Sequence, residues 1–416
     1  MRRFFLIALV LVLALILISA GTAWYLANDE AFLKSQLSKV VLEQTGRELA
    51  VDGPLTLDIG RQTSIEASGI RFQNAAWAEQ ADMVRVGRLA VTIDIPSLWD
   101  ETIIIPELSI EDCSIDLLKN ENGEANWDVL PEAEPDPEPP PPRTALPVQG
   151  NHVRIRNCSL DLDAPERERP LQIRLADLEL RLSDENRWVG DGAGSINDEE
   201  FSLSGWYGPV GAFYLGKPVE HQLQLSLGDI SLESSGTIED ALSFSGANVQ
   251  ARFHGPDIGK VLHNFSAPPV SEGAFDFRLE LDSEGEVTTL ELIGDLGSLN
   301  ARASGEFDRL KDTRTGHITA TVDGPDLEAM GQAFGVQGLV SDAFSLKADA
   351  NFSEGLTTVK YATLETSMDR VSINGDLGTG ADLANTALDI DLTSDEIGRW
   401  MPALNQEPKN LSLIHI

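Results

Sequence analysis

The sequence predicts a mostly β fold, in which short antiparallel strands form repeated units behind one apolar N-terminal helix. Three observations predict this class. Apolar and polar residues alternate in stretches such as "GAFDFRLELDSEG" at 273–285, which is the period of a strand with one apolar face. A "GPD" motif occurs at Gly255 and again at Gly324, 69 residues later, which indicates a structural repeat. Residues 4–27 contain no charged side chain.

Composition narrows the function classes. The chain has 416 residues, and its hydrophobic content of 42% is typical of a globular protein with two or three domains or one repeat array. Its 67 acidic and 31 basic residues give a formal net charge of -36. Nucleic acids and anionic lipid headgroups both attract clusters of Lys and Arg, which this balance opposes. We therefore expect no nucleic-acid partner.

Residues 1–28 are expected to form a short cytoplasmic tip and a transmembrane anchor. At about 1.5 Å per residue, the charge-free run is roughly 35 Å of helix, enough for a hydrocarbon core of about 30 Å. A signal peptide cleaved near Gly21-Thr22-Ala23 is the alternative. Arg2-Arg3 should stay in the cytoplasm and the bulk of the chain should be exported, to the periplasm in a bacterium with two membranes. The anchor side chains include Phe4, Leu11, Leu15, Ile18 and, at the far interface, Trp24 and Tyr25.

Residues 29–131 are expected to form a helix followed by a β domain. The helix, at 29–46, is short and amphipathic, begins at a capping Asn28 or Asp29 and ends at Gly46. Alternation then predicts strands at 48–58, 64–73, 83–95, 102–110 and 113–119. The Pro- and Glu-rich residues 132–146 cannot pack, so they are expected to be a linker or loop, extended where "EAEPDPEPPPPR" occurs.

The two cysteines occur in matching contexts, "IEDCSIDL" around Cys113 and "IRNCSLDL" around Cys158. The same kind of strand is used twice, with the cysteines at equivalent places. In an oxidising compartment they can form a disulfide if the strands are neighbours. Two buried free thiols are the alternative.

The rest of the chain is expected to be a β region followed by the repeats. Residues 147–254 show strands but no convincing helical period. The repeat units are 255–323 and 324–393, each a short helix followed by roughly four strands, and 394–410 starts a third unit. The last residues, 411–416, read "LSLIHI", fit no repeat and match a translated sequencing adapter, so we expect a non-native tail on a truncated protein.

The apolar faces of these strands need a cover. Each repeat has about a dozen inward apolar side chains, and burying each one stabilises the fold by about 1.5–3 kcal/mol. If they stayed exposed to water, roughly 18–36 kcal/mol of folding free energy would be lost. A typical domain has a net stability of only about 5–15 kcal/mol. A second sheet, the short helix or an apolar ligand can supply the cover. The helix has too few large side chains, and the residues alone leave a sandwich and an acyl-chain groove equally open.

No motif for catalysis or for phosphate, dinucleotide or metal binding occurs in the sequence. We therefore expect no enzyme, no catalytic residues, no metal and no cofactor. Two functions remain: a lipid conduit, or a non-enzymatic scaffold or assembly factor that holds outer-membrane protein segments by strand addition.

The chain resembles the AsmA family of bacterial envelope proteins. The resemblance covers roughly residues 1–163, in the anchor, "TGRELAVDGPLTLDIG", "IEASGIRFQNAAWAEQADMVRVGRLAVTIDIPSLW" and "IIIPELSIEDCSIDLLKNENGEANWDVL". It includes a "GxxNW" element, present here as Gly123, Asn126 and Trp127.

The resemblance implies a single-pass inner-membrane protein with a cytoplasmic N-terminus and a periplasmic body. Its repeated β units would form an elongated, curved groove for phospholipid tails, as in bridge-like lipid transfer proteins. The implied function is lipid transport between the inner and outer membranes and outer-membrane homeostasis, with phospholipids and envelope proteins as partners. The implied groove residues are Phe275, Phe277, Leu279, Leu281, Leu290, Leu292, Ile318 and Val322.

Overall fold

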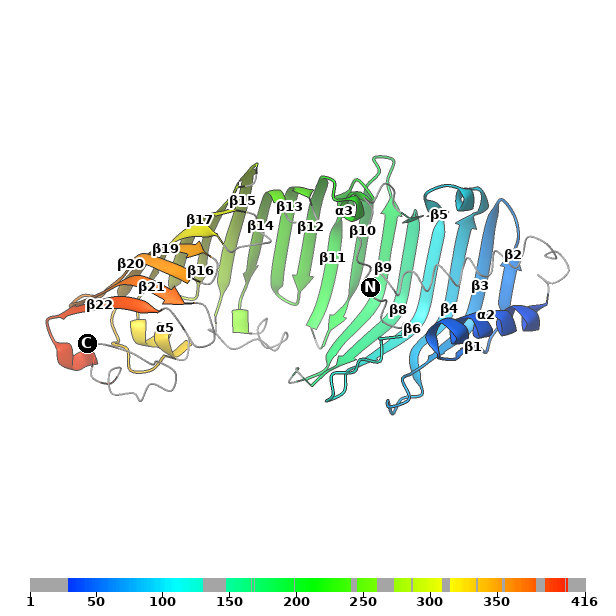
Figure 1. Ribbon diagram of the computed structural model, residues 1–416, viewed down its shortest axis with the longest axis horizontal. Coiled ribbons are helices and arrows are strands. Elements are labelled where there is room, and N and C mark those ends of the chain that lie inside the picture. The colour runs from blue at the N-terminus through cyan, green and yellow to red at the C-terminus, as the bar shows by residue number, and fades with distance from the viewer. Residues whose placement is uncertain are drawn as a thin grey trace. The chain divides into compact units, whose positions relative to one another are not determined.

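The computed structural model describes residues 29–129, 147–165, 167, 169–197, 199–240, 245–259, 273–285, 287–308, 315–333, 336–353, 356–378, 386–400 and 402. The chain divides between Gly211 and Ala212 into two compact units, whose elements Figure 1 labels. The expected anchor side chains, the Pro- and Glu-rich segment and the expected tail lie outside the described residues. Within the described ranges, no helix has both the length and the apolar character needed to span a membrane.

The first unit is built on one main sheet. In this sheet β1 and β2 both pair with β3, and β4, β6, β8, β9, β10 and β11 follow in that spatial order. The 3-10 helix η1 (Ile95–Trp99) and a separate pair, β5 (Ile103–Ile105) with β7 (Val148–Gly150), lie outside the main sheet. The main strands are β1 (Leu49–Val51), β2 (Leu55–Asp58), β3 (Gln62–Gln73), β4 (Asp82–Asp94), β6 (Glu107–Leu118), β8 (His152–Asp163), β9 (Leu171–Leu182), β10 (Trp188–Ile196) and β11 (Glu199–Gly208).

The antiparallel pairing that the sequence predicted is confirmed for most of the described strands, but β6 pairs with β8, and β5 with β7, in parallel. Parallel neighbours need a crossover of a dozen or more residues. The chain between Leu118 and His152, which includes the Pro- and Glu-rich segment, is long enough to provide it. That segment therefore connects two adjacent strands of one sheet.

A break in the alternation runs in register through five neighbouring strands of the first unit. In each strand one residue has no partner in the register: Gly69, Gly87, Asp112, Asn157 or Ala176. On either side of it, successive residues of the same face are three positions apart instead of two. Gly69, Asp112 and Asn157 have positive φ angles of 65°, 55° and 50°, which Gly, Asp and Asn tolerate best. Because of this break, the sequence predicted separate strands at 102–110 and 113–119. In the structure, residues Glu107–Leu118 form the single continuous strand β6.

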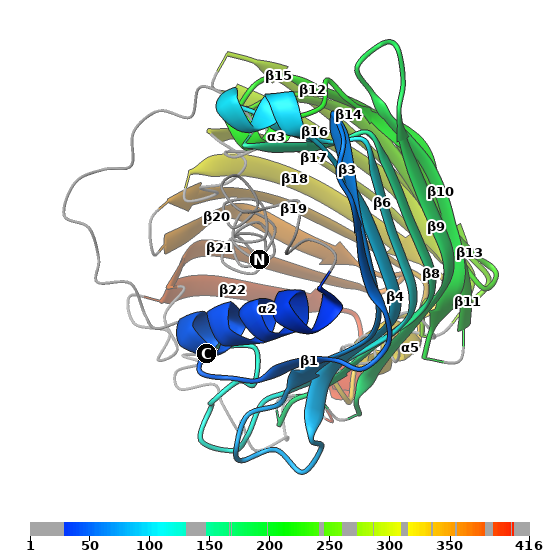
Figure 2. The same ribbon diagram turned by 90° about the vertical axis from the view of Figure 1, so that its right-hand side faces the viewer.

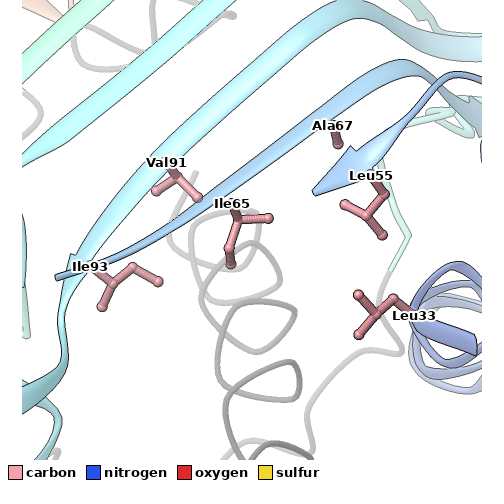
Figure 3. Packing of buried hydrophobic residues seen from close by; sticks show 6 residues of the cluster. All are labelled: Leu33, Leu55, Ile65, Ala67, Val91 and Ile93. Carbon is pink, nitrogen blue, oxygen red and sulfur yellow. The ribbon is translucent and has the colours of Figure 1, made fainter. Parts of the chain in front are cut away.

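The helix α2 (Glu30–Thr45) covers part of the main sheet's apolar face. The Asp29 carboxylate caps it by accepting hydrogen bonds from the Ala31 and Phe32 amides, and Gly46, at φ 70°, ends it, as the sequence predicted. Leu33 lies against the buried cluster of Leu55, Ile65, Ala67, Val91 and Ile93 (Figure 3). In Figure 2, α2 lies on the inner side of the curved strands β3 to β8.

The second unit is a sheet of strands β12 to β22, each antiparallel to the next along the chain. The strands after Gly255 form two sets of four, and the first strands of the sets start at Phe275 and Phe344, again 69 residues apart. The strands are β12 (Val219–Leu227), β13 (Ile230–Asp240), β14 (Ser245–Gly255), β15 (Phe275–Glu284), β16 (Val287–Leu296), β17 (Leu299–Asp308), β18 (Gly316–Gly324), β19 (Phe344–Ser353), β20 (Leu356–Glu365), β21 (Asp369–Gly378) and β22 (Ala387–Ser394).

Short helices mark the repeats. The aspartate of each "GPD" motif turns the chain, since Asp257 Oδ1 accepts from the Gly259 amide and Asp326 Oδ1 from the Glu328 amide. Asp326 begins α5 (Leu327–Ala333), and the third repeat starts with a 3-10 turn, η3 (Ile397–Trp400). The sequence missed α3 (Ala212–Leu215), because four residues are too few to show a helical period.

Candidate functional site: an uncharged face on each sheet

One face of the second unit's sheet is almost free of charge. Residues directly opposite each other on antiparallel strands share a face, so the register defines it strand by strand. Among the described strand residues, the titratable members of this face are His221, and Asp240 and Asp369 at strand ends. Its central row consists of Ala251, Leu279, Leu292, Ala303, Ala320, Ala348, Ala362 and Ile373.

All eight expected groove residues lie on this face. Leu279 pairs with Leu292 and Leu281 with Leu290, while Ile318 faces Gly305 and Val322 faces Ala301. Phe275 is only 4% exposed, and the other seven side chains are partly exposed. Their role in binding lipid stays a prediction. The sequence prediction did not include the continuation of the face onto β12, β13 and β14, although the same alternation signals it in Leu223, Leu232 and Phe253.

Aromatic rings on this face lie over cross-strand glycines. A Cβ on Gly294 would come within 2.1 Å of Phe277 Cδ1, and a Cβ on Gly305 within 2.9 Å of Phe307 Cε2. The rings of Phe275 and Phe253 contact each other with 4.6 Å between centroids and a tilt of 48°. Glycine therefore lets large apolar rings lie flat on the sheet, so that the face is apolar without being bulky.

Among the described residues, the buried clusters cover this face near its margins. Leu327 of α5 is fully buried with Val340, Phe344 and Trp400, against partly buried side chains that include Val322 and Leu346. At another place, Ala212 of α3 packs on Val219 and Ile238. Val322 thus has a protein neighbour, whereas Leu279, Leu281, Leu290 and Leu292 belong to none of the buried clusters found among the described residues.

The opposite face of the same strands is polar and charged. Arg252 donates two hydrogen bonds to the Asp276 carboxylate, at 2.9 and 2.7 Å, and thereby lowers the pKa of Asp276. Glu280 faces Glu291 directly across β15 and β16, which is unfavourable unless both stay hydrated. No group of three or more His, Cys, Asp or Glu in the described parts of the chain is placed to hold a metal ion. The two faces therefore differ sharply in character.

The first unit has a similar face. One row runs through Ile65, Val91, Leu108, Val153 and Leu180, and another contains Cys113 and Cys158. The cysteines face each other on the parallel strands β6 and β8 and form a disulfide with a Cα–Cα distance of 4.4 Å. Of the two alternatives from the sequence, a disulfide or two free thiols, the structure contains the disulfide. Both cysteines are buried.

A polar pair on the face of the second unit was missed by the sequence prediction. His221 Nε2 and Ser234 Oγ are 2.8 Å apart, and both residues belong to the face that also carries Leu223 and Leu232. Burial lowers the pKa of His221, which favours its neutral form. No charge is therefore expected there at neutral pH. The pair could not be found from the sequence, because a single His or Ser in a strand is unremarkable.

The Gly123, Asn126 and Trp127 element joins several parts of the first unit. Asn126 is fully buried, and its Nδ2 donates to Asn74 Oδ1 at 2.9 Å and to the Asp116 carbonyl at 2.7 Å. Its Oδ1 accepts from the Leu118 amide at 2.8 Å. Gly123 occupies a turn at φ 83°, and the Trp127 side chain is 36% exposed. The element therefore fixes the end of β6 to the β3–β4 connection.

The fold and these faces define a class: a predominantly β protein with a mainly apolar face on the sheet of each unit. Residues 1–190 match the family model described as AsmA family, and this match assigns that part of the chain to the AsmA family. The matched part ends within β10, so the second unit lies outside it. Comparison with curated proteins and with solved structures gave no match. At the level of the family, membership supports an envelope- and lipid-related role.

Proposed function

We propose that the protein shields phospholipid acyl chains on its uncharged faces, and so contributes to lipid transport between the inner and outer membranes and to outer-membrane homeostasis. Residues 4–27 hold it in the inner membrane, with the N-terminus in the cytoplasm and the bulk in the periplasm. The observation that carries the proposal is the uncharged face of the second unit, whose central side chains are partly exposed. The proposed activity makes and breaks no bond.

The energetic argument favours an apolar ligand over water on this face. Leu279, Leu281, Leu290 and Leu292 form two cross-strand pairs in the middle of the face. Completing the burial of such side chains yields up to about 1.5–3 kcal/mol each. Acyl chain tails have no hydrogen-bonding groups, so the wholly apolar central row of the face shields them without leaving a polar side chain of that row unpaired.

Photocrosslinking on one strand tests the proposal. A photoreactive phenylalanine analogue replaces Leu279 in one variant and Arg278 in the other, in the full chain in living cells. The two positions are consecutive but lie on opposite faces, and the Arg278 side chain is 68% exposed. We expect crosslinks to phospholipid from position 279 and few from position 278.

A second pair of variants connects lipid contact with function. Leu279→Asp places a charge on the face and should abolish function while the chain stays folded, whereas Arg278→Asp should be tolerated. Equal lipid crosslinking from both positions, or full function of a folded Leu279→Asp chain, would contradict the lipid-shielding proposal. The latter result would favour the scaffold or assembly factor for outer-membrane proteins, which depends on strand edges and not on the polarity of the face.

A further inference from the structure

Two neighbouring turns of the first unit expose apolar side chains at the same edge. The turn between β2 and β3 carries Ile59, which is 48% exposed, and η1 ends with Trp99, which is 79% exposed. The turns touch, since the Ile95 amide at the start of η1 donates to the Arg61 carbonyl at 2.9 Å. An exposed tryptophan beside an exposed isoleucine is an apolar surface without a cover from the described residues.

Trp99 is held in this exposed position by its neighbours. Ser97 is 1% exposed; its Oγ donates to the Asp94 carbonyl at 2.6 Å and accepts from the Ile104 amide at 2.8 Å. The Asp100 amide closes the turn on the Ser97 carbonyl at 3.0 Å. Leu98 packs against the buried cluster below. The exposure of Trp99 is therefore built into a fixed turn.

The same cluster receives the start of α2. Leu33, in the first turns of α2, belongs to the cluster on which Leu98 packs. The Glu30 carboxylate accepts from the Leu55 amide at 3.3 Å, at the beginning of the strand that leads to Ile59. Only residues 28 and 29 separate α2 from the charge-free run 4–27, so the end of that run is at most about 11 Å from Glu30. The chain thus leaves the first unit toward that run beside the cluster that supports Trp99.

We propose that the exposed turns form a membrane-contact edge, with Trp99 and Ile59 entering the interface of the bilayer that holds residues 4–27. Tryptophan favours the interfacial region because its ring is apolar and its N–H is polar. Asp58, Asp100 and Glu101 are exposed around these turns and outnumber the exposed cation Arg61, so the contact favours zwitterionic over anionic lipid. This inference rests on the membrane anchoring in the proposed function, and it is independent of lipid on the uncharged faces.

The test uses the full chain reconstituted into vesicles of zwitterionic phospholipid that carry a photoreactive group near the glycerol backbone. Wild type is compared with Trp99→Ala, Ile59→Ser and the control Val189→Ser, and crosslinked lipid is mapped to single residues by fragmentation of the tryptic peptides. Val189 is 45% exposed in the same unit, on the face opposite the uncharged one. Retention of the chain in alkali-washed vesicles is measured in parallel and reports the anchor alone.

We expect crosslinked lipid at Trp99 and Ile59, a severalfold loss at each of these sites on substitution, and no effect of Val189→Ser. Adding anionic lipid should not increase the yield. Anchored protein without lipid at these two residues would overturn the membrane-contact edge and leave the proposed function standing. Protein that is washed off the vesicles would overturn the anchor, and with it this inference. Equal labelling around Val189 would also overturn the edge, since the contact would then be nonspecific.

Discussion

Asn126 shows why one polar residue can matter to the stability of the first unit. Its side chain is fully buried, and its amide pairs with Asn74, Asp116 and Leu118. The Asn126 carbonyl also accepts a hydrogen bond from the Arg47 guanidinium, just beyond α2. Buried polar groups that lose their partners cost far more than exposed ones, because no water replaces the lost bond.

Replacing Asn126 by alanine should destabilise the first unit strongly. The Leu118 amide and the Asp116 carbonyl would each lose a partner, at about 1–3 kcal/mol, so we expect a loss of about 2–6 kcal/mol in the free energy of unfolding. Urea unfolding followed by circular dichroism measures it. Asn122→Ala, on the exposed part of the same turn, is the control and should cost under about 0.5 kcal/mol. Equal effects of the two variants would contradict the role given to Asn126.

Glu179 on β9 should make the stability of the first unit depend on pH in the acidic range. Arg154, at 2.8 Å, and His152, at 2.7 Å, lower the pKa of Glu179 to about 2, whereas an unfolded chain has a glutamate pKa near about 4.3. A depressed pKa stabilises the fold above the unfolded value, and this contribution is lost as the pH falls from about 5 towards 2.

Glu179→Gln should therefore lower the thermal midpoint at pH 7 and flatten its fall below pH 5. The measurement is a series of thermal melts between pH 7 and pH 3 for wild type and variant. Glu43→Gln, on the exposed side of α2, should leave the wild-type profile unchanged. A Glu179→Gln profile parallel to wild type would show that the contacts of the Glu179 carboxylate with Arg154, Arg181 and His152 add no stability.

At the scale of single elements, the pairing of aromatic rings with glycines determines how far the side chains of the uncharged face extend from the sheet. The close approach of Phe277 to Gly294 leaves no room for a side chain there. Gly294→Ala should therefore force the ring off the sheet and cost about 1–3 kcal/mol in the free energy of unfolding. In a Phe277→Ala background the same change should cost much less. Urea unfolding of the two single variants and the double variant measures this coupling, and additive effects would contradict it.

The strands were largely predictable from the sequence, because alternation is a local signal. Residues 273–285 alternate without a break, and β15 forms there. The parallel pairing of β6 with β8 was not predictable, since pairing direction depends on a crossover with no pattern of its own. The break at Asp112 hid the continuity of β6 for a different reason: a residue with positive φ shifts the alternation by one position.

The candidate site was predictable only in part. The alternation placed Leu279 and Leu292 on the apolar side of their strands, and the register of the structure puts them opposite each other. The cover that α5 provides near Val322 depends on tertiary packing of Leu327, which no local pattern reveals. The His221–Ser234 contact likewise joins two strands whose register is not encoded in either strand alone.

At the scale of the whole molecule, the proposed function depends on an uninterrupted uncharged face in the second unit. Ala303, Ala320 and Ala348 are directly opposite one another in its central row. These small side chains leave space above the sheet, while the next residue of the face on β18, Val322, packs beneath the cluster around α5. An obstacle at Ala320 would therefore interrupt the part of the face that the short helix leaves open.

Ala320→Trp tests whether this space is used. A large apolar side chain keeps the face uncharged, so lipid contact on β15 should persist, but movement of acyl chains across β18 should be blocked. We expect transport between donor and acceptor vesicles to fall at least about tenfold, which is about 1.4 kcal/mol. Thr321→Trp adds the same ring on the opposite face of β18, where Thr321 faces Arg302, and should transport normally. Normal transport by a folded Ala320→Trp chain would mean that lipid does not travel along the face, and would restrict the proposal to static shielding of acyl chains.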